Sequence, residues 1–391
     1  MPSPPRLLFL FSDTGGGHRS ATEAVIEALR LQSGDSLQID AVDFLKQYGP
    51  YPFHRLPDWY PNMVRQPRAW HLGYRLIDSP RRIRLLTRLT WPYIRRASLR
   101  LARQHPADLI ICLHPIATDP GLRAIRRTYP ANRRPPLIVI VTDLVSTHAY
   151  WYHPQADLTL LPTEPARHRA LACGLNPEKL RVHGLPVSQK FSTPVGDPAL
   201  TRPAACTALG WPADHPMILL VGGGDGMGPL EQTARAIAET LAASSLQAGL
   251  AIVTGRNSAV RQRLEAINWP MPTFIHGFVD NMPDLMRAAS ILVTKAGPGT
   301  ISEALNTGLP MILYSHLPGQ ETGNIGYLTG HGAAIWAPTP GEVASALRGW
   351  LADPQGYAQA LEACRRLARP DAARQVATAI LAELNKVRIE A

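Results

Sequence analysis

Short runs of apolar residues alternate along the chain with stretches whose apolar positions recur at helical spacing. Continuous Val, Ile and Leu runs of this kind are typical of parallel strands that are buried on both faces. Two series of such strands, most of them followed by a helix, predict an α/β fold with two doubly wound domains. We expect strands at 7–11, 109–113, 137–141 and 158–161, and then at 217–221, 251–254, 273–276, 291–294 and 311–314.

Helical spacing and proline content predict the domain boundaries. Helices are expected over 20–31, 121–128, 231–242, 302–307 and 370–387. The proline-rich stretch between the two strand series is the best linker candidate. We therefore expect an N-terminal domain over 1–190, a linker over 191–216, a C-terminal domain over 217–369 and a final helix within 370–391.

The segment 55–103 breaks this alternation because arginine dominates it. It carries twelve arginines against two aspartates, a net charge of +10 that equals that of the whole chain. Ser79-Pro80 predicts a helix start, since proline favours the first helical position. The helix is expected to place Ile83, Leu86, Leu89 and Ile94 on one face and Arg81, Arg84, Arg88 and Arg95 on another.

Tryptophans and tyrosines are interleaved with these arginines. Basic side chains beside Trp59, Trp70 and Trp91 suit the surface of an anionic bilayer. The alternatives are an ordinary solvated helix pair packed on the domain, or a nucleic-acid surface, although no nucleic-acid-binding module accompanies the arginines.

Composition narrows the class of protein. A hydrophobic content of 45% in 391 residues excludes a disordered chain, and a pI near 9.7 favours an anionic partner. The four scattered cysteines lack metal-site spacing and are expected to be free thiols in a reducing cytosol. No apolar run approaches the length of about 18 residues that spans a bilayer, so any membrane contact is expected to be peripheral.

The first glycine-rich loop, 12–20, follows a predicted strand and precedes a predicted helix. Gly16 and Gly17 allow a sharp turn and a close approach to a ligand. His18 is expected at the carboxyl end of the strand, where open α/β sheets bind ligands. The positive end of the helix is expected to keep His18 neutral at pH 7, which suits a general base; a purely structural histidine is the alternative. No Gly-Lys-Ser/Thr follows, so the loop is not a Walker P-loop.

Two more glycine loops follow strands of the second series. The loop 222–228 has five glycines in seven positions, including Gly223 and Gly224, which favours a ligand loop over a plain tight turn. In the loop 294–304 a helix is expected to start near Thr300, with the N–H groups of Gly299 and Thr300 facing a phosphate. Glu303 is expected to accept hydrogen bonds from ribose hydroxyls, or to be a capping-box carboxylate three residues after Thr300.

A fourth loop, 318–324, follows the last predicted strand. It contains Gln320, Glu321 and Asn324, and amide and carboxylate groups side by side are suited to sugar hydroxyls.

Seven motifs together resemble a known family. They are, in order, SDTGGGHRSATEA, TDLVSTHAYWYHPQAD, HGLPV, GGGDGMGPL, GFVDNMPDLM, TKAGPGTISEA and PGQETGN. They resemble monogalactosyldiacylglycerol synthase and its relatives, the processive diacylglycerol glucosyltransferases, from about Leu7 to Ile335. The chain is more loosely similar to the peptidoglycan N-acetylglucosaminyltransferase of the same superfamily.

The resemblance implies a GT-B fold, in which two Rossmann-like domains face a cleft. The N-terminal domain would bind the acceptor and the C-terminal domain the UDP-sugar, with the last helix crossing back onto the N-terminal domain. The implied donor-site residues are Phe278 and Val279 beside the uracil, Glu303 at the ribose, Gly299 and Thr300 at the diphosphate, and Gln320 and Glu321 at the sugar, with Gly223, Gly224 and Asn324 nearby.

The resemblance also implies the chemistry. His18 would deprotonate the acceptor hydroxyl, and Asp143 would orient His18, share its role or merely cap a loop. The acceptor-side and membrane residues would be Gly16, Gly17, Trp59, Trp70, Arg81, Arg84, Arg88 and Trp91. The reaction would transfer a hexose from a UDP-sugar to diacylglycerol with inversion, giving a β-glycolipid. No Asp-x-Asp motif is present, so neither a metal nor another cofactor is expected.

The expected protein is cytoplasmic and peripherally associated with the cell membrane, with no nucleic-acid partner. Two alternatives keep the nucleotide-sugar site: a transferase or epimerase acting without a lipid acceptor, and a catalytically inactive binder. The sequence alone does not distinguish galactose from glucose as the transferred sugar.

Overall fold

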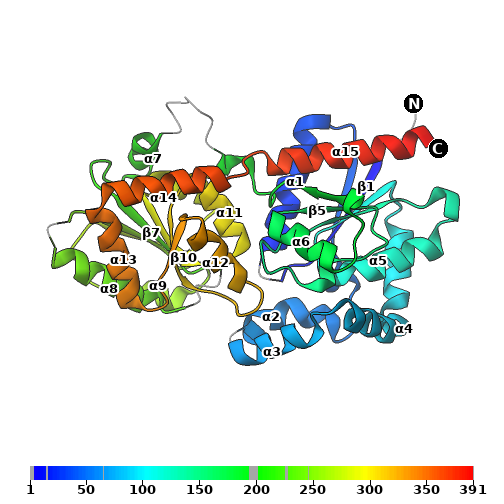
Figure 1. Ribbon diagram of the computed structural model, residues 1–391, viewed down its shortest axis with the longest axis horizontal. Coiled ribbons are helices and arrows are strands. Elements are labelled where there is room, and N and C mark those ends of the chain that lie inside the picture. The colour runs from blue at the N-terminus through cyan, green and yellow to red at the C-terminus, as the bar shows by residue number, and fades with distance from the viewer. Residues whose placement is uncertain are drawn as a thin grey trace. The chain divides into compact units, whose positions relative to one another are not determined.

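The computed structural model describes residues 4–14, 16–64, 66–192, 201–224, 228–244 and 246–390 (Figure 1). The chain divides into two units. The first comprises Met1–Gln189, Pro318–Gln320 and Asp371–Ala391, and the second comprises Lys190–Leu317 and Glu321–Pro370.

The first unit is built on a six-stranded parallel sheet in the order β2-β1-β3-β4-β5-β6. Its central strands are almost wholly apolar and fully buried, as expected for a sheet covered on both faces. The strands are β1 (Arg6–Phe11), β2 (Gln38–Asp43), β3 (Leu109–Cys112), β4 (Leu137–Ile140), β5 (Leu158–Leu161) and β6 (Leu180–Val182).

Helices cover both faces of this sheet. One face holds α1 and α15, whose side chains share a hydrophobic cluster with β1 and β3. The helices are α1 (Gly17–Ser33), α2 (Leu56–Val64), α3 (Pro67–Ile77), α4 (Pro80–Gln104), α5 (Pro115–Thr128), α6 (Glu164–Ala172) and α15 (Ala372–Glu390). Short helical turns lie at η1 (Phe44–Tyr48), η2 (Phe53–Arg55), η3 (Ala131–Arg133), η4 (Ala149–Trp151) and η5 (Pro177–Lys179).

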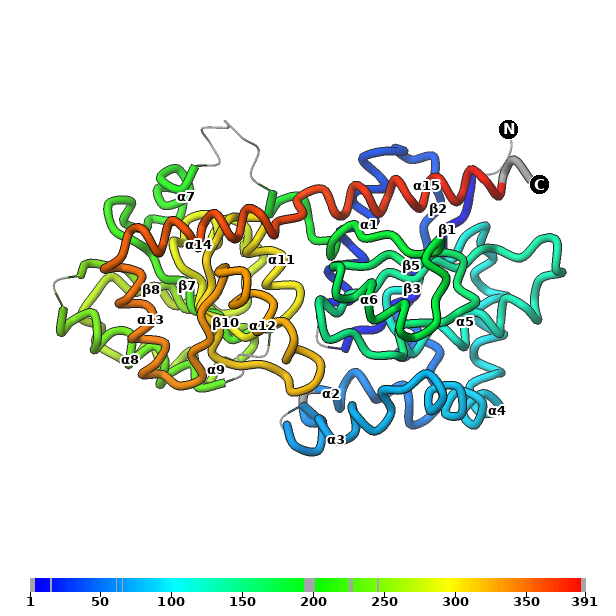
Figure 2. The backbone as a smooth tube through the Cα atoms, viewed as in Figure 1, coloured from blue at the N-terminus to red at the C-terminus, as the bar shows by residue number. Residues whose placement is uncertain are grey.

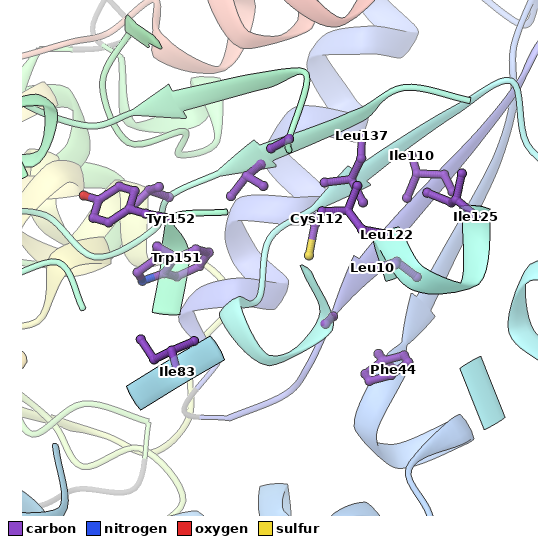
Figure 3. Packing of buried hydrophobic residues seen from close by; sticks show 14 of the residues in the cluster. Leu10, Phe44, Ile83, Ile110, Cys112, Leu122, Ile125, Leu137, Trp151 and Tyr152 are labelled. Carbon is purple, nitrogen blue, oxygen red and sulfur yellow. The ribbon is translucent and has the colours of Figure 1, made fainter. Parts of the chain in front are cut away.

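The cluster on the opposite face joins the sheet to α4 and α5. Figure 3 shows Leu10, Ile110 and Leu137 of three strands beside Leu122 and Ile125 of α5. Ile83, Trp91 and Ile94 bring α4 into the same cluster. The long basic helix is therefore anchored to the domain by its apolar face.

The second unit contains another six-stranded parallel sheet, in the order β12-β11-β10-β7-β8-β9. The strands are β7 (Met217–Val221), β8 (Gly249–Val253), β9 (Thr273–His276), β10 (Ile291–Lys295), β11 (Met311–Ser315) and β12 (Ala334–Trp336). The helices are α7 (Arg202–Leu209), α8 (Leu230–Ala242), α9 (Ser258–Glu265), α10 (Met282–Ala288), α11 (Pro298–Asn306), α12 (Thr322–Gly330), α13 (Pro340–Ala352) and α14 (Pro354–Leu367), and η6 (Gln189–Phe191) lies at the boundary of the two units.

The two doubly wound parallel sheets confirm the predicted fold class, and all nine predicted strands are present. Pattern reading missed β2, β6 and β12. β2 carries three polar residues in six, and β6 and β12 have only three residues each at sheet edges. The polar residues of β2 and the shortness of β6 and β12 leave no apolar run for the pattern to detect.

Helix positions needed more correction than strand positions. Three helices begin earlier than expected, α1 at Gly17, α5 at Pro115 and α11 at Pro298. The predicted linker 191–216 contains α7, which packs against α10; residues 193–200 lie outside the described residues.

The basic segment forms α2, α3 and α4, which Figure 2 shows as a blue-to-cyan layer along one edge of the first unit. α4 begins at Pro80, as predicted. The predicted apolar face is wrong at Leu89, which is 70% exposed. Leu85, Leu89 and Tyr93 instead form an exposed apolar stripe at helical spacing.

Trp91 also departs from expectation. It is 7% exposed and lies in the core, with the guanidinium groups of Arg123 and Arg127 stacked 5.4 and 5.2 Å from its ring centroid. Its side chain is therefore unavailable to a membrane surface, and the arginines that contact it belong to α5.

We expect Trp91→Ala to reduce the free energy of unfolding by about 3–5 kcal/mol, because it removes a large buried side chain and leaves a cavity. Leu89→Ala on the same helix is the matched control, with an expected change within about 0.5 kcal/mol. Urea denaturation measures both. Equal costs for the two variants would show that α4 is not anchored through Trp91.

Candidate functional site

Polar residues of the first unit gather at the carboxyl ends of three adjacent strands. In the sheet order β2-β1-β3, the chain leaves β1 toward one side and returns on the other. The ends of β1 and β3 thus form a topological switch point, where open α/β sheets bind ligands. The glycine loop follows β1, His114 follows β3, and Thr142 and Asp143 follow β4.

His18 lies half-buried in the first turn of α1. Its Nδ1 is 2.8 Å from Thr142 Oγ1, and its ring packs edge-on against His114 with centroids 4.7 Å apart. Burial lowers the pKa of His18 to about 4, although the Leu113 carbonyl and the Asp13 carboxylate act in the opposite direction. The imidazole is therefore neutral at pH 7, and burial rather than the helix dipole is the main cause.

Thr142 contacts His18 at Nδ1. When the His18 Nδ1–H donates to the Thr142 hydroxyl, the lone pair of Nε2 is left to accept a proton. Thr142 is 5% exposed, so the contact is shielded from water. Sequence reasoning singled out Asp143 and overlooked the residue before it.

His114 is a second residue that sequence reasoning missed. It is 4% exposed, and its Nε2 is 3.0 Å from Thr14 Oγ1. Burial, together with the nearby His18 ring, lowers the pKa of His114 well below its usual range. Two neutral rings can share this space without charge repulsion. Its position just after a buried strand is the signal that also identified His18.

The glycine loop is held from the end of β2. Asp43 is 3% exposed and accepts hydrogen bonds from Ser12 Oγ at 3.0 Å and from the Asp13 backbone N–H at 3.1 Å. Gly16 adopts a left-handed conformation with φ of 79° and caps α1. A Cβ atom at Gly16 or Gly17 would meet nothing within 4 Å. Both glycine positions thus face open space.

Asp143 is 5% exposed and accepts two hydrogen bonds from uncharged donors. Trp151 Nε1 donates to Oδ2 at 2.7 Å, and Gln320 Nε2 donates to Oδ1 at 2.9 Å. Trp151 also contacts the His18 ring, with centroids 5.9 Å apart. Asp143 therefore positions two neighbouring side chains of the site.

The second unit has its own switch point, between β7 and β10. Gly223 and Gly224 follow β7; Gly223 adopts a φ of +73° and is half-buried, and Gly224 is exposed. Asp225, Gly226 and Met227 of the same loop lie outside the described residues. The loop after β10 leads into α11.

The start of α11 offers backbone donors. Gly297 is its N-cap, so Gly299 and Thr300 occupy the first turn, where N–H groups have no acceptor within the helix. A Cβ atom at Gly299 would meet nothing within 4 Å. The N–H groups and the positive end of the helix suit a phosphate group here.

Glu303 is not a capping residue, because the N-cap lies six residues before it and makes no side-chain hydrogen bond. The capping-box alternative is therefore wrong. The Glu303 side chain is half-buried, and burial raises the pKa of its carboxyl group to about 7. A desolvated carboxylate gains hydrogen bonds when ligand hydroxyls reach it.

Phe278 is 63% exposed just beyond β9, and the Arg256 guanidinium lies 4.7 Å from its ring centroid. An exposed aromatic ring in a loop is a stacking surface for a planar ligand such as a base. Val279 beside it is half-buried.

The loop before α12 holds the remaining predicted donor residues. Glu321 is 4% exposed; it accepts the Leu317 N–H at 2.7 Å and pairs with Lys295. Asn324 is fully buried and donates to the Ala296 carbonyl at 2.9 Å. Gln320 packs with the first unit through Asp143. All three predicted residues are thus held by protein partners.

The predicted membrane residues separate into two groups. Trp59 is 40% exposed, and Arg81, Arg84 and Arg88 are all exposed. Trp70 is half-buried, with its ring against Tyr60 at 5.5 Å, and Trp91 is in the core, as described above. Across the part of the chain that the structure describes, no helix is both long and apolar enough to cross a membrane.

No group of three or more His, Cys, Asp and Glu side chains that could hold a metal ion occurs within the described ranges. The site chemistry available from these residues is that of a neutral imidazole, backbone N–H donors, carboxylates and amides.

Comparison with family models matches both units. Residues 18–187 match the model described as monogalactosyldiacylglycerol (MGDG) synthase, and residues 217–336 match the glycosyltransferase family 28 C-terminal domain.

Curated relatives match over nearly the full chain. A probable chloroplastic monogalactosyldiacylglycerol synthase of Glycine max is 35% identical over 375 residues, covering 94% of this chain and 69% of the relative. A probable monogalactosyldiacylglycerol synthase 2 of Oryza sativa subsp. japonica is 36% identical over 350 residues, covering 88% and 73%.

Solved structures show the same fold at low identity. MnaA of S. aureus, solved with UDP, aligns with a TM-score of 0.63 at 14% identity and covers 97% of each chain. MurG of Acinetobacter baumannii aligns with a TM-score of 0.61 at 15% identity and covers 97% of this chain and 100% of its own. Each unit therefore has the Rossmann-like architecture of the GT-B fold.

The raised pKa of Glu303 predicts a pH-dependent stability. Between roughly pH 4.5 and 7 the folded state keeps a proton that the unfolded chain, whose glutamate pKa is about 4.3, has already released. The Glu303 contribution to the free energy of unfolding therefore falls as pH rises through this window, because ionisation of the Glu303 carboxyl opposes folding. Glu303→Gln cannot ionise, so it should become more stable relative to wild type from pH 5 to pH 8.

Urea denaturation at several pH values measures this difference. Glu362→Gln on α14 is the matched control for removing an exposed carboxylate. A constant difference between Glu303→Gln and wild type across the range would contradict the assignment.

Proposed function

The chain belongs to the monogalactosyldiacylglycerol synthase family, and on that premise we propose that it transfers galactose from UDP-galactose to diacylglycerol. Family membership makes it a glycosyltransferase that uses a UDP-sugar. Galactose is favoured over glucose because the relatives, 35% and 36% identical, are named for the galactosyl product. Identity that extends across both units favours a transferase over an epimerase on the same fold.

The observation that carries the proposal is the neutral, half-buried His18 at the switch point of the first sheet. The imidazole is unprotonated at pH 7, and its place in the first turn of α1 lets it take the proton of an acceptor hydroxyl in the transition state. The open space beside Gly16 and Gly17 admits that hydroxyl to the ring.

The reaction follows from these groups. The diacylglycerol hydroxyl oxygen forms a bond to the anomeric carbon on the face opposite UDP, and its proton passes to His18 Nε2. The anomeric carbon–oxygen bond to the diphosphate breaks, and its electron pair stays on the phosphate oxygen. The result is inversion to a β-glycoside.

In the second unit we assign different residues to the different parts of the UDP-sugar. Phe278 and Val279 flank the uracil, Glu303 accepts ribose hydroxyls, and the N–H groups of Gly299 and Thr300 bind the diphosphate. Gly223 and Gly224 allow the ligand to approach the backbone closely, and Gln320 contacts the sugar. Glu321 and Asn324, predicted as sugar contacts, are buried on protein partners and support this loop instead. Backbone donors at the helix start oppose charge that grows on the leaving group, which favours the transition state. We propose that neither a metal ion nor another cofactor takes part.

We further propose that the layer formed by α2, α3 and α4 docks on an anionic membrane surface. Among the described residues, all exposed large apolar side chains except Leu31 and Phe278 lie between residues 51 and 93, beside the exposed arginines. They are Tyr51, Trp59, Met63, Leu72, Leu76, Ile77, Leu85, Leu89 and Tyr93. Apolar side chains that enter a bilayer, ringed by arginines that meet lipid phosphates, bring the enzyme to an acceptor that does not leave the membrane.

Incubation with diacylglycerol vesicles and labelled UDP-galactose or UDP-glucose, with a chelator present, tests the function. We expect a galactolipid as the main product by lipid chromatography. His18→Ala should lower turnover by roughly 10²–10⁴, the usual contribution of a general base, and leave UDP affinity unchanged.

Absence of lipid product from either donor would refute the proposal, and glucolipid as the main product would correct the sugar. Full turnover in folded His18→Ala would remove His18 from the mechanism.

The membrane surface is tested by vesicle co-sedimentation. Leu85→Ser combined with Leu89→Ser should weaken binding, because each leucine gives up about 1.5–3 kcal/mol of apolar burial. Changing Arg81, Arg84 and Arg88 to Gln should abolish the preference for anionic lipid, at about 1 kcal/mol per arginine. Leu31→Ser, another exposed leucine at 67%, is the matched control. Unchanged vesicle binding in both sets of variants would show that another surface contacts the membrane.

A further inference from the structure

Lys295 is the last residue of β10 and lies at the switch point of the second sheet. The pairing of β10 with β11 shifts register between Thr294 and Lys295. Such an irregularity re-aims the side chain at the end of a strand. None of the roles described so far uses this ammonium group.

Two glycines lie beside the Lys295 side chain, and Gly297 makes room for its ammonium. A Cβ atom at Gly223 would lie 3.6 Å from Lys295 Cε, and one at Gly297 would lie 2.9 Å from Nζ. A larger residue at 297 would therefore displace the ammonium. The side chain thus lies between the loop after β7 and the loop that begins α11, the two backbone segments assigned to the donor.

Among the described residues, the ammonium pairs with Glu321 and is otherwise partly exposed. Its Nζ is 2.5 Å from Glu321 Oε1, while Oε2 of the same carboxylate accepts the Leu317 N–H. The Glu321 side chain is 6% exposed, but that of Lys295 is 30% exposed. An ammonium has three N–H donors, so Lys295 can keep Glu321 and still donate to an anion on its exposed side.

We propose that Lys295 binds the diphosphate of the nucleotide sugar and stabilises the UDP leaving group. This inference rests on the proposed function and adds a cation to its donor site. As the anomeric carbon–oxygen bond breaks, its electron pair passes to the phosphate oxygen, and the fixed ammonium opposes the charge that accumulates there. Glu321 holds the ammonium in place before the donor arrives.

The competing explanation is that Lys295 only neutralises the buried Glu321 carboxylate. The two roles differ in what happens when both charges are removed. A structural counter-ion becomes dispensable once its carboxylate is gone, since the cost of the single change is an unpaired buried charge. If Lys295 binds the diphosphate, that contact is still absent in the double variant, and UDP binding stays weak.

Calorimetry with UDP and with uridine separates the phosphate contact from the nucleoside contact. We expect Lys295→Met to weaken UDP binding about 10- to 100-fold, the range of a hydrogen bond to a charged group, with uridine affinity unchanged. The double variant Lys295→Met with Glu321→Gln should remain as weak for UDP. Lys295→Arg, which keeps the charge, should recover part of the affinity.

Lys386→Met is the matched control, because Lys386 also forms an ion pair, with Glu383 at 2.7 Å, but on α15. Restored UDP affinity in the double variant, or equal losses for UDP and uridine, would overturn the inference. If Lys295→Met does not fold, wild type and Lys295→Arg are compared instead. Inorganic pyrophosphate should compete with UDP more weakly in Lys295→Arg than in wild type. Wild type that binds no UDP would refute the proposed function instead.

Discussion

Partial burial of His18 is the constraint on which the first site depends. An exposed imidazole would be partly protonated near neutral pH, but burial lowers its pKa to about 4. A buried ring nitrogen needs a hydrogen-bond partner, and Thr142 meets that need at Nδ1 of His18. His114 fills the adjacent space with a second neutral ring, which a charged side chain could not do without its own partner.

The arrangement around His18 depends on contacts from neighbouring strands of the first sheet. The loop that carries His18 is held by Asp43 at the end of β2 and by His114 at the end of β3, on either side of β1. The two contacts come from strands that are far apart in sequence but adjacent in the sheet. The strand order therefore places both contacts beside the segment that leads to His18.

Sequence patterns predicted the features that follow from residue type alone, namely apolar strands and glycine loops. Apolar runs, most of them fully buried, identified nine strands, and glycine loops after strands located both switch points. Residues whose role depends on tertiary neighbours were not predictable in the same way. Thr142 and His114 are ordinary residues until β3 and β4 bring them to His18, and Asp43 lies on a strand that the pattern missed. Trp91 looked like an interfacial tryptophan because its burial comes from α5, which the local pattern of α4 does not contain.

The two switch points share a backbone plan but differ in charge, and the difference matches their proposed ligands. The first collects neutral imidazoles and a hydroxyl, with Asp143 bonded to uncharged donors. This environment suits a neutral alcohol that must lose a proton. The second combines the positive end of α11 with the ammonium of Lys295, which suits an anion whose charge increases during reaction. A doubly wound sheet supplies the same bare loop and helix start in both units. The side chains that surround each loop then determine whether it receives a hydroxyl or a diphosphate.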